Sequence, residues 1–449
     1  MVPLSIEVSV IRGKNLRSFF ARCAIQIGRP KPFHLVNVSR WLDRPILLAS
    51  SGTGFRRLAQ RLITQHHLSD PRWVLATTIP GDPGSSAMLG DLTLAMNAAK
   101  IANPLVKLDI WDQWTQDLFE PSYMSMPAAG GAHVIYVYIR AASVENPKNV
   151  SNPLRQAGKV VFALRGKDIA AVQQYNLKSD PSMGSLDSFG NTETIPPYTL
   201  GGASYPLGRL FRGKTSSFYP DPTMTTLLES QQVQPPVYID TSWLLVGHVD
   251  ETITFVRART PRGWALVVND PTMAKQMLQK ESAAGYGSTQ MFVGKSWIDY
   301  GSGEYPAAAS IDKVLADTNV MGASALAAVE VDKQVATIKA ETGITDAEIL
   351  RLPFLHWKVE GFAVAYMVGT VNGVSLGDTH YAAPDPHGPV IGGKDIFKAQ
   401  MEDEMSKVGI TVHWVEDWDL YHRLDGEIHC GCNIAREVSP SGPWWESGR

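Results

Sequence analysis

Residues 231–256 read QQVQPPVYIDTSWLLVGHVDETITFV, and this stretch carries the strongest indication of the fold class. Two strands are predicted at 242–249 and 252–256, because each is a short β-branched or aromatic run bounded by turn residues. His248 and Asp250 stand two positions apart, so a strand would point both side chains to one face. Two ionisable groups among apolar neighbours need partners. The pair is either a satisfied core His–Asp contact, a strand end that reaches solvent, or part of a reactive site.

Strands and helices are predicted to mix along the rest of the chain. Apolar spacing predicts helices over 53–65 and 324–342, the second ended by Gly343, and TDAE at 345–348 reads as a capping box that opens a short helix up to Pro353. Further strands are expected at 133–139, 159–164 and 264–269. The class is therefore α/β or α+β. We find no sequence repeat of fixed period, although a structural repeat can exist without one.

Composition limits the possible partners. The 449 residues are 44% hydrophobic and 19% charged, which is typical of a globular protein. A formal net charge of −3 gives no long-range attraction for nucleic acid or an anionic membrane. No apolar run approaches the roughly 20 residues that span a bilayer. Three cysteines cannot make a disulfide framework, so we expect a cytoplasmic protein, with residues 1–40 as a leader of uncertain order.

An acidic and aromatic stretch, DIWDQWTQDLFE at 109–120, is a candidate binding site for a cation. Asp112, Asp117 and Glu120 lie close to Trp111 and Trp114. A carboxylate neutralises a cationic ligand and an aromatic ring stacks on it. The alternative is a solvated acidic turn anchored by core tryptophans.

A Pro- and Gly-rich stretch at 180–214 is longer than a plain connection needs, which is typical of functional loops. Within it, Asp187, Asn191 and Glu193 fall within seven residues. Oxygens at such spacing suit a hard cation such as Ca²⁺, and an ordinary Asn/Thr-rich turn is the alternative.

Cys430 and Cys432, beside His429, raise the question of a metal site, a disulfide or a nucleophile. Zinc would need a second ligand cluster, and a disulfide between the two would close a strained ring. Cys23 is the only other thiol. What remains is a reactive thiol with a distant histidine, or an inert buried one.

Several ordered stretches together resemble the catalytic region of the peptidyl-arginine deiminases. They run in the family's order over about residues 40 to 449. The matching stretches are WTQDLFE (114–120), GSLDSFGNTETIPP (184–197), YPLGR (205–209), residues 231–251, HGPVIGG (387–393), DGEIHCGCN (425–433) and the final WW (444–445).

The resemblance implies a five-bladed α/β propeller of the pentein type with pseudo-fivefold symmetry. It places the catalytic domain at 41–449. Vertebrate relatives carry two immunoglobulin-like domains ahead of it, which residues 1–40 are too few to hold, so none is expected. The implied reaction converts peptidyl-arginine in proteins or peptides to peptidyl-citrulline, with release of ammonia.

The resemblance also assigns roles to residues. Cys430 is the implied nucleophile, His248 the general acid and base, and Asp117 and Asp250 the groups that bind the guanidinium. Further substrate contacts are expected from Trp114, Val246 and Arg140. His429 is expected to point away from the site if its segment is extended.

Calcium is the implied cofactor, because the family's first calcium site is retained. Its ligands would be the side chains of Gln116, Glu120 and Glu193 and the backbone carbonyls of Phe189 and Thr192. The second site does not map, since Leu118 stands where the family has an acid. The loop that carries substrate-binding arginines is also missing, and Arg140 or Arg155 is the candidate replacement. We therefore expect weak calcium dependence, or none.

Two rival functions stay open at this point. One is deimination of free arginine, agmatine or another small guanidine, which the missing arginines favour. The other is a non-catalytic module that binds arginine-containing peptides, which would require the loss of a catalytic group.

Overall fold

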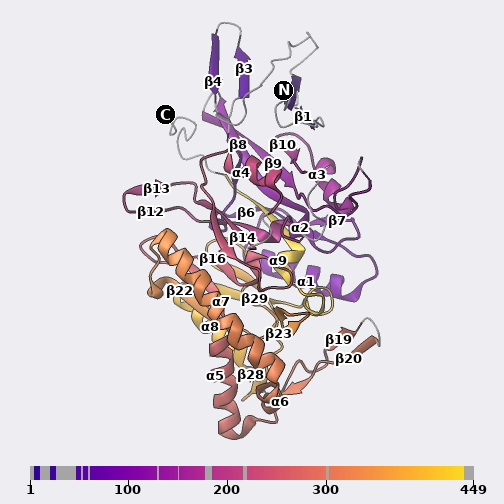
Figure 1. Ribbon diagram of the computed structural model, residues 1–449, viewed down its shortest axis with the longest axis vertical. Coiled ribbons are helices and arrows are strands. Elements are labelled where there is room, and N and C mark those ends of the chain that lie inside the picture. The colour runs from indigo at the N-terminus through magenta and orange to yellow at the C-terminus, as the bar shows by residue number, and fades with distance from the viewer. Residues whose placement is uncertain are drawn as a thin grey trace.

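The computed structural model describes residues 61–128, 131–149, 151–176, 185–215, 220–299 and 303–438. It also describes the backbone of two antiparallel strand pairs, β1 (Ser5–Val10) with β2 (Ala21–Gln26) and β3 (Leu47–Ser51) with β4 (Gly54–Leu58). The rest of the expected leader at 1–40 and the tryptophans at 444–445 lie outside the described residues. Strands and helices mix throughout the structure, so the α/β prediction is confirmed (Figure 1).

A structural repeat organises the described part of the chain, although the sequence shows none. Five sheets share one pattern, in which a central strand pairs antiparallel with one neighbour and parallel with the other. In chain order, the sheets are β30 (Cys432–Arg436), β6 (Pro71–Thr77) and β7 (Val106–Leu108); β8 (Phe119–Ala128), β9 (Gly131–Arg140) and β10 (Ile169–Gln173), extended by β5 (Ile63–Thr64); β11 (Thr192–Ile195), β14 (Arg209–Lys214) and β15 (Val237–Asp240); β16 (Ile253–Arg257), β17 (Trp264–Asp270) and β22 (Ile349–Pro353); and β25 (Val374–Ser375), β26 (His380–Pro384) and β29 (Thr411–Val415).

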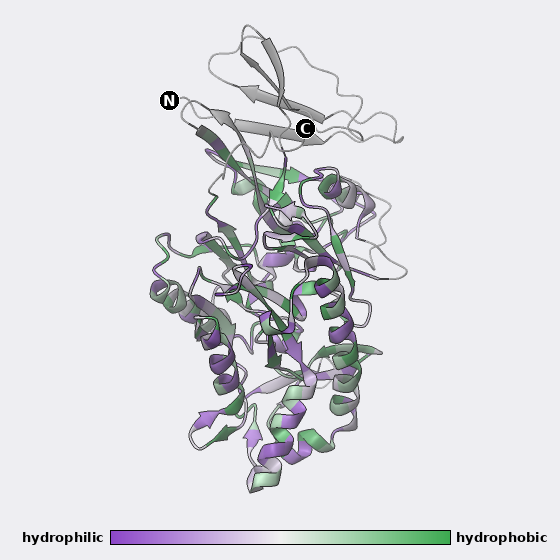
Figure 2. Cartoon of the chain, turned by 90° about the vertical axis from the view of Figure 1, so that its left-hand side faces the viewer, coloured by the Kyte–Doolittle hydropathy of each residue, from purple (hydrophilic) through white to green (hydrophobic). Residues whose placement is uncertain are grey.

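Helical segments connect the parallel strands of each sheet, as a parallel pair requires a crossover. In the order of the sheets these are α1 (Pro83–Ala98), α3 (Val160–Ala163), α4 (Pro222–Glu229), α5 (Pro271–Glu281) with α6 (Ile311–Ala316) and α7 (Thr318–Thr342), and α8 (Ile396–Lys407). The longer helices of the described structure carry both hydrophilic and hydrophobic residues (Figure 2), so an apolar face can pack on the sheets while polar residues face outward. Within the described ranges, no helix has the length and apolarity needed to cross a bilayer.

Smaller hairpins complete the described structure. They are β12 (Tyr198–Leu200) with β13 (Ala203–Tyr205), β18 (Gln290–Met291) with β21 (Ala309–Ser310), β19 (Ser296–Asp299) with β20 (Gly303–Pro306), β23 (His356–Val359) with β24 (Phe362–Ala365), and β27 (Val390–Ile391) with β28 (Lys394–Asp395).

The helix predicted at 324–342 is confirmed as the C-terminal part of α7. Val331, Val335 and Ile338 are buried on one face, and Gly343 caps the helix with a left-handed φ of 72°. Only glycine adopts this conformation without steric cost, which explains why the helix ends there.

Three sequence predictions of local structure are wrong. The segment 53–65 forms the strands β4 and β5, and 159–164 is helical, with a 3₁₀ turn running into α3. The run 242–249 is a turn region after β15 rather than a strand. The runs at 159–164 and 242–249 are short and mostly apolar, and periodicity alone cannot separate strand from helix in such runs. The capping box at Thr345 is present, but it opens only a 3₁₀ turn before β22.

The chain closes on itself through the first sheet. β30, near the C-terminal end, pairs antiparallel with β6, with Cys432 opposite Ala76. This pairing fixes the segment just before β30, which contains Cys430, against the N-terminal part of the described structure.

Candidate active site

The candidate site is built from short segments that each lead directly into the first strand of a sheet. Asp117 lies in α2 (Thr115–Leu118) before β8, and the turn Phe189–Asn191 precedes β11. The turn Val249–Glu251, which follows His248, precedes β16, and α9 (Ile428–Gly431) precedes β30. These turns pack on one another in the interior, where α2 and α9 are seen in Figure 1. The structural repeat therefore brings together residues that are more than 300 positions apart.

Cys430 is buried in α9, just before β30, with 5% of its surface exposed. Its Sγ lies 3.4 Å from Oδ1 of Asn372 and 3.8 Å from Oδ2 of Asp250. Burial raises the pKa of the Cys430 thiol well above its usual range, and the carboxylates of Asp250 and Asp117 raise it further. The neutral thiol is therefore favoured when no positive charge lies against these carboxylates.

His248 directs one ring nitrogen into the site. Its Nε2 lies 2.8 Å from the carbonyl oxygen of Ser185. Because a carbonyl can only accept a hydrogen bond, Nε2 carries the proton and donates it. The other ring nitrogen, Nδ1, faces the two carboxylates, 3.9 Å from Asp117 Oδ1 and 4.0 Å from Asp250 Oδ1. The spacing argument for His248 and Asp250 assumed a shared strand face, which is wrong. His248 caps a 3₁₀ turn and Asp250 lies within it, but both reach the site.

Gly190 lets the backbone of the neighbouring turn approach His248 closely. A Cβ atom at this position would lie 2.5 Å from His248 Nδ1 and 3.0 Å from Asp250 Oδ2. Any side chain here would displace the imidazole.

The two carboxylates are held by different partners. Asp250 Oδ2 accepts a hydrogen bond from Nδ1 of His429 at 2.9 Å. Asp117 Oδ2 accepts one from Nη1 of Arg155 at 2.9 Å, and the same guanidinium donates to Asp112 at 2.7 and 2.8 Å. Burial raises the pKa of Asp117, while His248 and Arg155 oppose that shift. Each carboxylate therefore keeps an oxygen directed toward His248.

His429 does not point away from the site, so that expectation is wrong. Its segment is a helical turn rather than an extended strand, and this rotation carries the imidazole to Asp250. Burial alone would lower the pKa of His429, but Glu193 and Asp250 outweigh burial and raise it. The residue contacts the carboxylate of Asp250 and has no described contact with the sulfur of Cys430.

The three expected substrate contacts differ in where they lie. Trp114 immediately precedes α2 and packs over Gly426, where a Cβ atom would lie 2.3 Å from the indole ring. Val246 is half-buried, and its carbonyl accepts a hydrogen bond from the hydroxyl of Ser185. Both positions adjoin segments that carry catalytic candidates.

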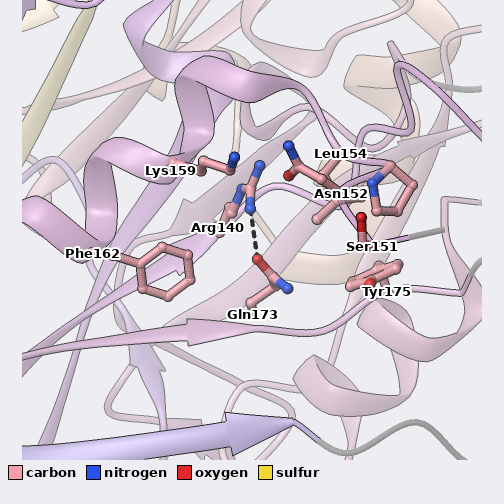
Figure 3. A pocket seen from close by; sticks show the side chains of 9 residues that line it. Arg140, Ser151, Asn152, Leu154, Lys159, Phe162, Gln173 and Tyr175 are labelled. Carbon is pink, nitrogen blue, oxygen red and sulfur yellow. Dashed lines mark hydrogen bonds between the residues drawn. The ribbon is translucent and has the colours of Figure 1, made fainter. Parts of the chain in front are cut away.

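Arg140 faces a separate cavity of about 390 Å³ (Figure 3). Its guanidinium donates to Oε1 of Gln173 and to the carbonyl of Arg155, each at 2.7 Å. None of the four catalytic candidates lines this cavity. Arg140 thus helps to position the backbone of Arg155. Its described contacts include none with the catalytic candidates.

The proposed calcium ligands are partly brought together. Gln116 Nε2 lies 3.3 Å from Glu120 Oε2 and 3.2 Å from the carbonyl of Phe189. Burial, with Glu193 nearby, raises the pKa of Glu120 well above its usual range. The hydroxyl of Thr192 accepts a hydrogen bond from Arg212 at 3.1 Å, and its backbone N–H donates to the carbonyl of Phe189.

Glu193 is engaged by two histidines. Its Oε2 lies 2.9 Å from Nε2 of His67 and its Oε1 lies 3.3 Å from Nε2 of His429. Although burial opposes ionisation, His67 and His429 lower the pKa of Glu193. The oxygen atoms of the expected calcium ligands suit a hard cation. The imidazoles of His67 and His429, however, compete with such a cation for the carboxylate of Glu193.

The other two residues of that loop have structural roles. Asp187 accepts a hydrogen bond from the backbone of Asp221, and Asn191 donates to the carbonyls of Leu186 and Gly213, both at 3.1 Å. For these two, the alternative of an ordinary turn is correct.

Sequence reasoning missed several residues of the site. Asn372 donates to the carbonyl of Asp250 at 3.0 Å and accepts from the backbone of Cys430 at 3.4 Å, so it joins the two segments. Its only signal was the Asn-Gly pair that marks a turn. Ser185 and Gly190 lie in a quoted motif, but their roles depend on His248, which is distant in sequence. No local sequence pattern indicates the place of His67 in the site or the pairing of Arg155 with Asp117.

Comparison with known proteins identifies the family. The family model described as protein-arginine deiminase (PAD) matches residues 56–446. The chain is 31% identical to human protein-arginine deiminase type-1 over 361 residues, which cover 79% of this chain and 50% of that relative. It is 30% identical to human type-4 over 369 residues, covering 79% of this chain and 50% of the relative. The chain belongs to the protein-arginine deiminase family. It spans about half the length of the curated relatives it matches.

Solved structures also resemble the fold at low sequence identity. The agmatine deiminase of Enterococcus faecalis has a TM-score of 0.46 and 11% identity, over 84% of this chain and 96% of that one. The agmatine deiminase of C. jejuni has a TM-score of 0.45 and 12% identity, over 86% and 99% of the two chains.

Proposed function

We propose that the chain hydrolyses the guanidinium of arginine residues in peptides and proteins, forming citrulline and ammonia. Membership of the family supports this function. The observation that carries it is the convergence of one thiol, one imidazole with a free nitrogen, and two carboxylates in a buried site. We further propose that the five sheets are the blades of a pseudo-fivefold propeller, and that residues 41–449 form the catalytic domain behind a leader at 1–40.

The carboxylates of Asp117 and Asp250 would bind the substrate. A guanidinium is a planar fork of N–H donors, and a carboxylate accepts two of them side by side. Both carboxylates face His248 Nδ1 at about the same distance, so a guanidinium held between them would present its nitrogens to that ring and its central carbon to the thiol. Trp114 and Val246 would contact the methylene stem.

Substrate binding would also activate the nucleophile. The carboxylates that raise the pKa of Cys430 are the same two that bind the cation. A bound guanidinium cancels their charge and places positive charge beside the sulfur, which favours the thiolate. Activation of the thiol is thereby tied to the presence of a cationic substrate.

The reaction then needs one side chain, His248, that donates a proton to the leaving group and later accepts one from water. The Cys430 thiol gives its proton to His248 Nδ1, and the resulting thiolate attacks the central carbon, forming a C–S bond and a tetrahedral adduct. Protonated His248 Nδ1 donates to the departing nitrogen, the C–N bond breaks, and ammonia leaves a covalent thiouronium. His248 next takes a proton from water, which attacks the same carbon. The C–S bond breaks, and citrulline and the thiol are released.

A small guanidine is a second candidate substrate, because the two arginines expected to hold a peptide backbone have other partners. Arg140 contacts Gln173 and a carbonyl, and Arg155 is committed to Asp112 and Asp117. The rates with a blocked arginine ester, free arginine and agmatine decide between the two. A higher kcat/KM for the ester supports the peptidyl substrate.

We propose that calcium dependence is weak or absent. Gln116, Glu120, Glu193 and the carbonyls of Phe189 and Thr192 would hold the ion, which would tie α2 to the turn at 189–191. The contacts of Glu193 with two imidazoles oppose this binding, because calcium prefers oxygen ligands. Turnover should change little between added calcium and a chelator, and a steep cooperative calcium response would contradict the proposal.

The central experiment measures citrulline and ammonia from the blocked ester with Cys430→Ala. We expect no turnover, whereas Cys432→Ala, which removes a second buried thiol two residues away, should retain it. Turnover in Cys430→Ala would refute the mechanism. Intact binding of arginine peptides by the unmodified chain, with no turnover of any of the three substrates, would support a non-catalytic binding module instead.

A further inference from the structure

We propose that His67, Glu193 and His429 form a binding site for a divalent transition metal of the zinc class. Ligand atoms of the three side chains all lie within 4.8 Å of one another. Each residue is more than nine-tenths buried, with exposures of 8%, 6% and 7%. The site contains two nitrogen donors, which distinguishes it from an all-oxygen calcium site.

The orientation of both imidazoles fits metal binding. Each directs Nε2 toward the carboxylate of Glu193, at 2.9 Å for His67 and 3.3 Å for His429. Two ligands of one tetrahedral zinc lie about 3.4 Å apart, as follows from bonds of about 2.1 Å. The observed separations are close to this spacing, so small shifts would suffice to bind an ion.

The second nitrogen of each ring is held by another group. His429 Nδ1 donates to Asp250 Oδ2 at 2.9 Å, and His67 Nδ1 lies 3.3 Å from the hydroxyl of Thr254. A bound ion would take the place of the Nε2 protons that face Glu193, while the Nδ1 contacts hold both rings in position. A histidine that donates to a carboxylate behind it is the usual support of a zinc ligand, because the contact fixes the tautomer and the ring orientation.

A small polar cavity adjoins the three side chains. Its volume is about 30 Å³, and Gln116, Glu120 and all three proposed ligands line it. The buried Glu193 Oε1 makes no well-aligned hydrogen bond within the described structure, and its neighbour is Nε2 of His429 at 3.3 Å. A buried carboxylate oxygen in this position would gain from a bound cation. The cavity has room for one ion, and water or Glu120 would supply a fourth ligand.

Glu193 is also one of the proposed calcium ligands, so the two ions would compete for it. Two imidazoles around one carboxylate favour the ion that accepts nitrogen ligands, and calcium does not. The same imidazoles therefore explain both a weak response to calcium and affinity for a zinc-class ion.

Binding is tested on the full chain after removal of metals with a chelator. Zinc is titrated against a chromophoric competitor, and bound metal is counted after desalting. We expect one zinc per chain and visible ligand-field bands with Co²⁺. His67→Gln should weaken zinc binding at least about tenfold. The adjacent, half-buried His66 is the matched control, and His66→Gln should bind normally.

Two further variants exclude other locations for the ion. His380 Nδ1 lies 2.8 Å from His413 Nε2, so a histidine pair elsewhere offers a rival site. Binding should survive His380→Gln, and it should survive Cys430→Ser. Loss of binding in either variant would overturn the proposal, as would absence of stoichiometric zinc or unchanged binding in His67→Gln. Calcium binding that Glu193→Gln abolishes and His67→Gln spares would identify an oxygen site instead. These readouts do not depend on turnover.

Discussion

Replacing Asp250 with asparagine should change the reactivity of Cys430 in opposite directions toward neutral and cationic reagents. The Asp250 carboxylate lies 3.8 Å from the sulfur, and two unit charges at this distance repel by about 4 kcal/mol at an effective dielectric constant of about 20. His429 compensates part of that charge. If only a third of the repulsion remains, its removal still increases the thiolate population about tenfold, because 1.4 kcal/mol corresponds to a factor of 10.

The assay compares alkylation by neutral 2-chloroacetamide and by cationic 2-chloroacetamidine, with modification of Cys430 followed by mass spectrometry. In the unmodified chain the raised pKa of Cys430 makes the neutral reagent slow at pH 7.5, and its rate should rise as the pH increases. In Asp250→Asn the neutral reagent should react about tenfold faster, whereas the cationic reagent should react more slowly because it loses a binding partner. Asp221→Asn, at a helix cap that asparagine also satisfies, is the control. An unchanged or slower neutral rate in Asp250→Asn would refute the electrostatic argument.

Three other substitutions test how the site is held together. Gly190→Ala should lower kcat by about 100-fold, because a Cβ atom 2.5 Å from His248 Nδ1 must displace the imidazole. Asn372→Ala should lower kcat about tenfold or more with little change in KM, and should lower the free energy of unfolding by about 1–3 kcal/mol, since buried groups lose their partners. Arg155→Gln should lower kcat/KM, because Asp117 loses the donor that orients it. Steady-state kinetics with the blocked ester, and denaturant unfolding for the asparagine variant, measure these effects.

Matched controls exist for two of these variants. Gly90→Ala adds a methyl group where nothing lies within 4 Å, so activity should be unchanged. Arg165→Gln removes an exposed arginine whose described hydrogen bond is to the carbonyl of Phe162. Full activity in Gly190→Ala, or an equal loss in the two arginine variants, would contradict the assigned roles.

The chemical identities of the main site residues could be predicted from the sequence. The ordered motifs indicated the family, and through it Cys430, His248, Asp117 and Asp250, which the structure brings close together. The helix at 324–342 was also predictable, because it is long, periodic and ended by a glycine.

Local structure at the site was not predictable, because it depends on contacts between distant segments. The run at 242–249 is as apolar as a strand, yet it forms a turn that places His248 beside residues of three other sheets. Periodicity describes how a segment is buried, and several backbone conformations bury the same residues.

What the sequence by itself determined is therefore the set of reactive groups and the mixed α/β class. Only the tertiary structure decided which groups share a partner: Arg155 with Asp117, Asn372 with Cys430, and His67 with Glu193 and His429. The physical reason is that each of these contacts joins segments that are separated in the sequence, and only the packing of the repeated sheets sets their distances. A residue's chemistry is local in the chain, whereas its neighbours in space are set by the whole fold.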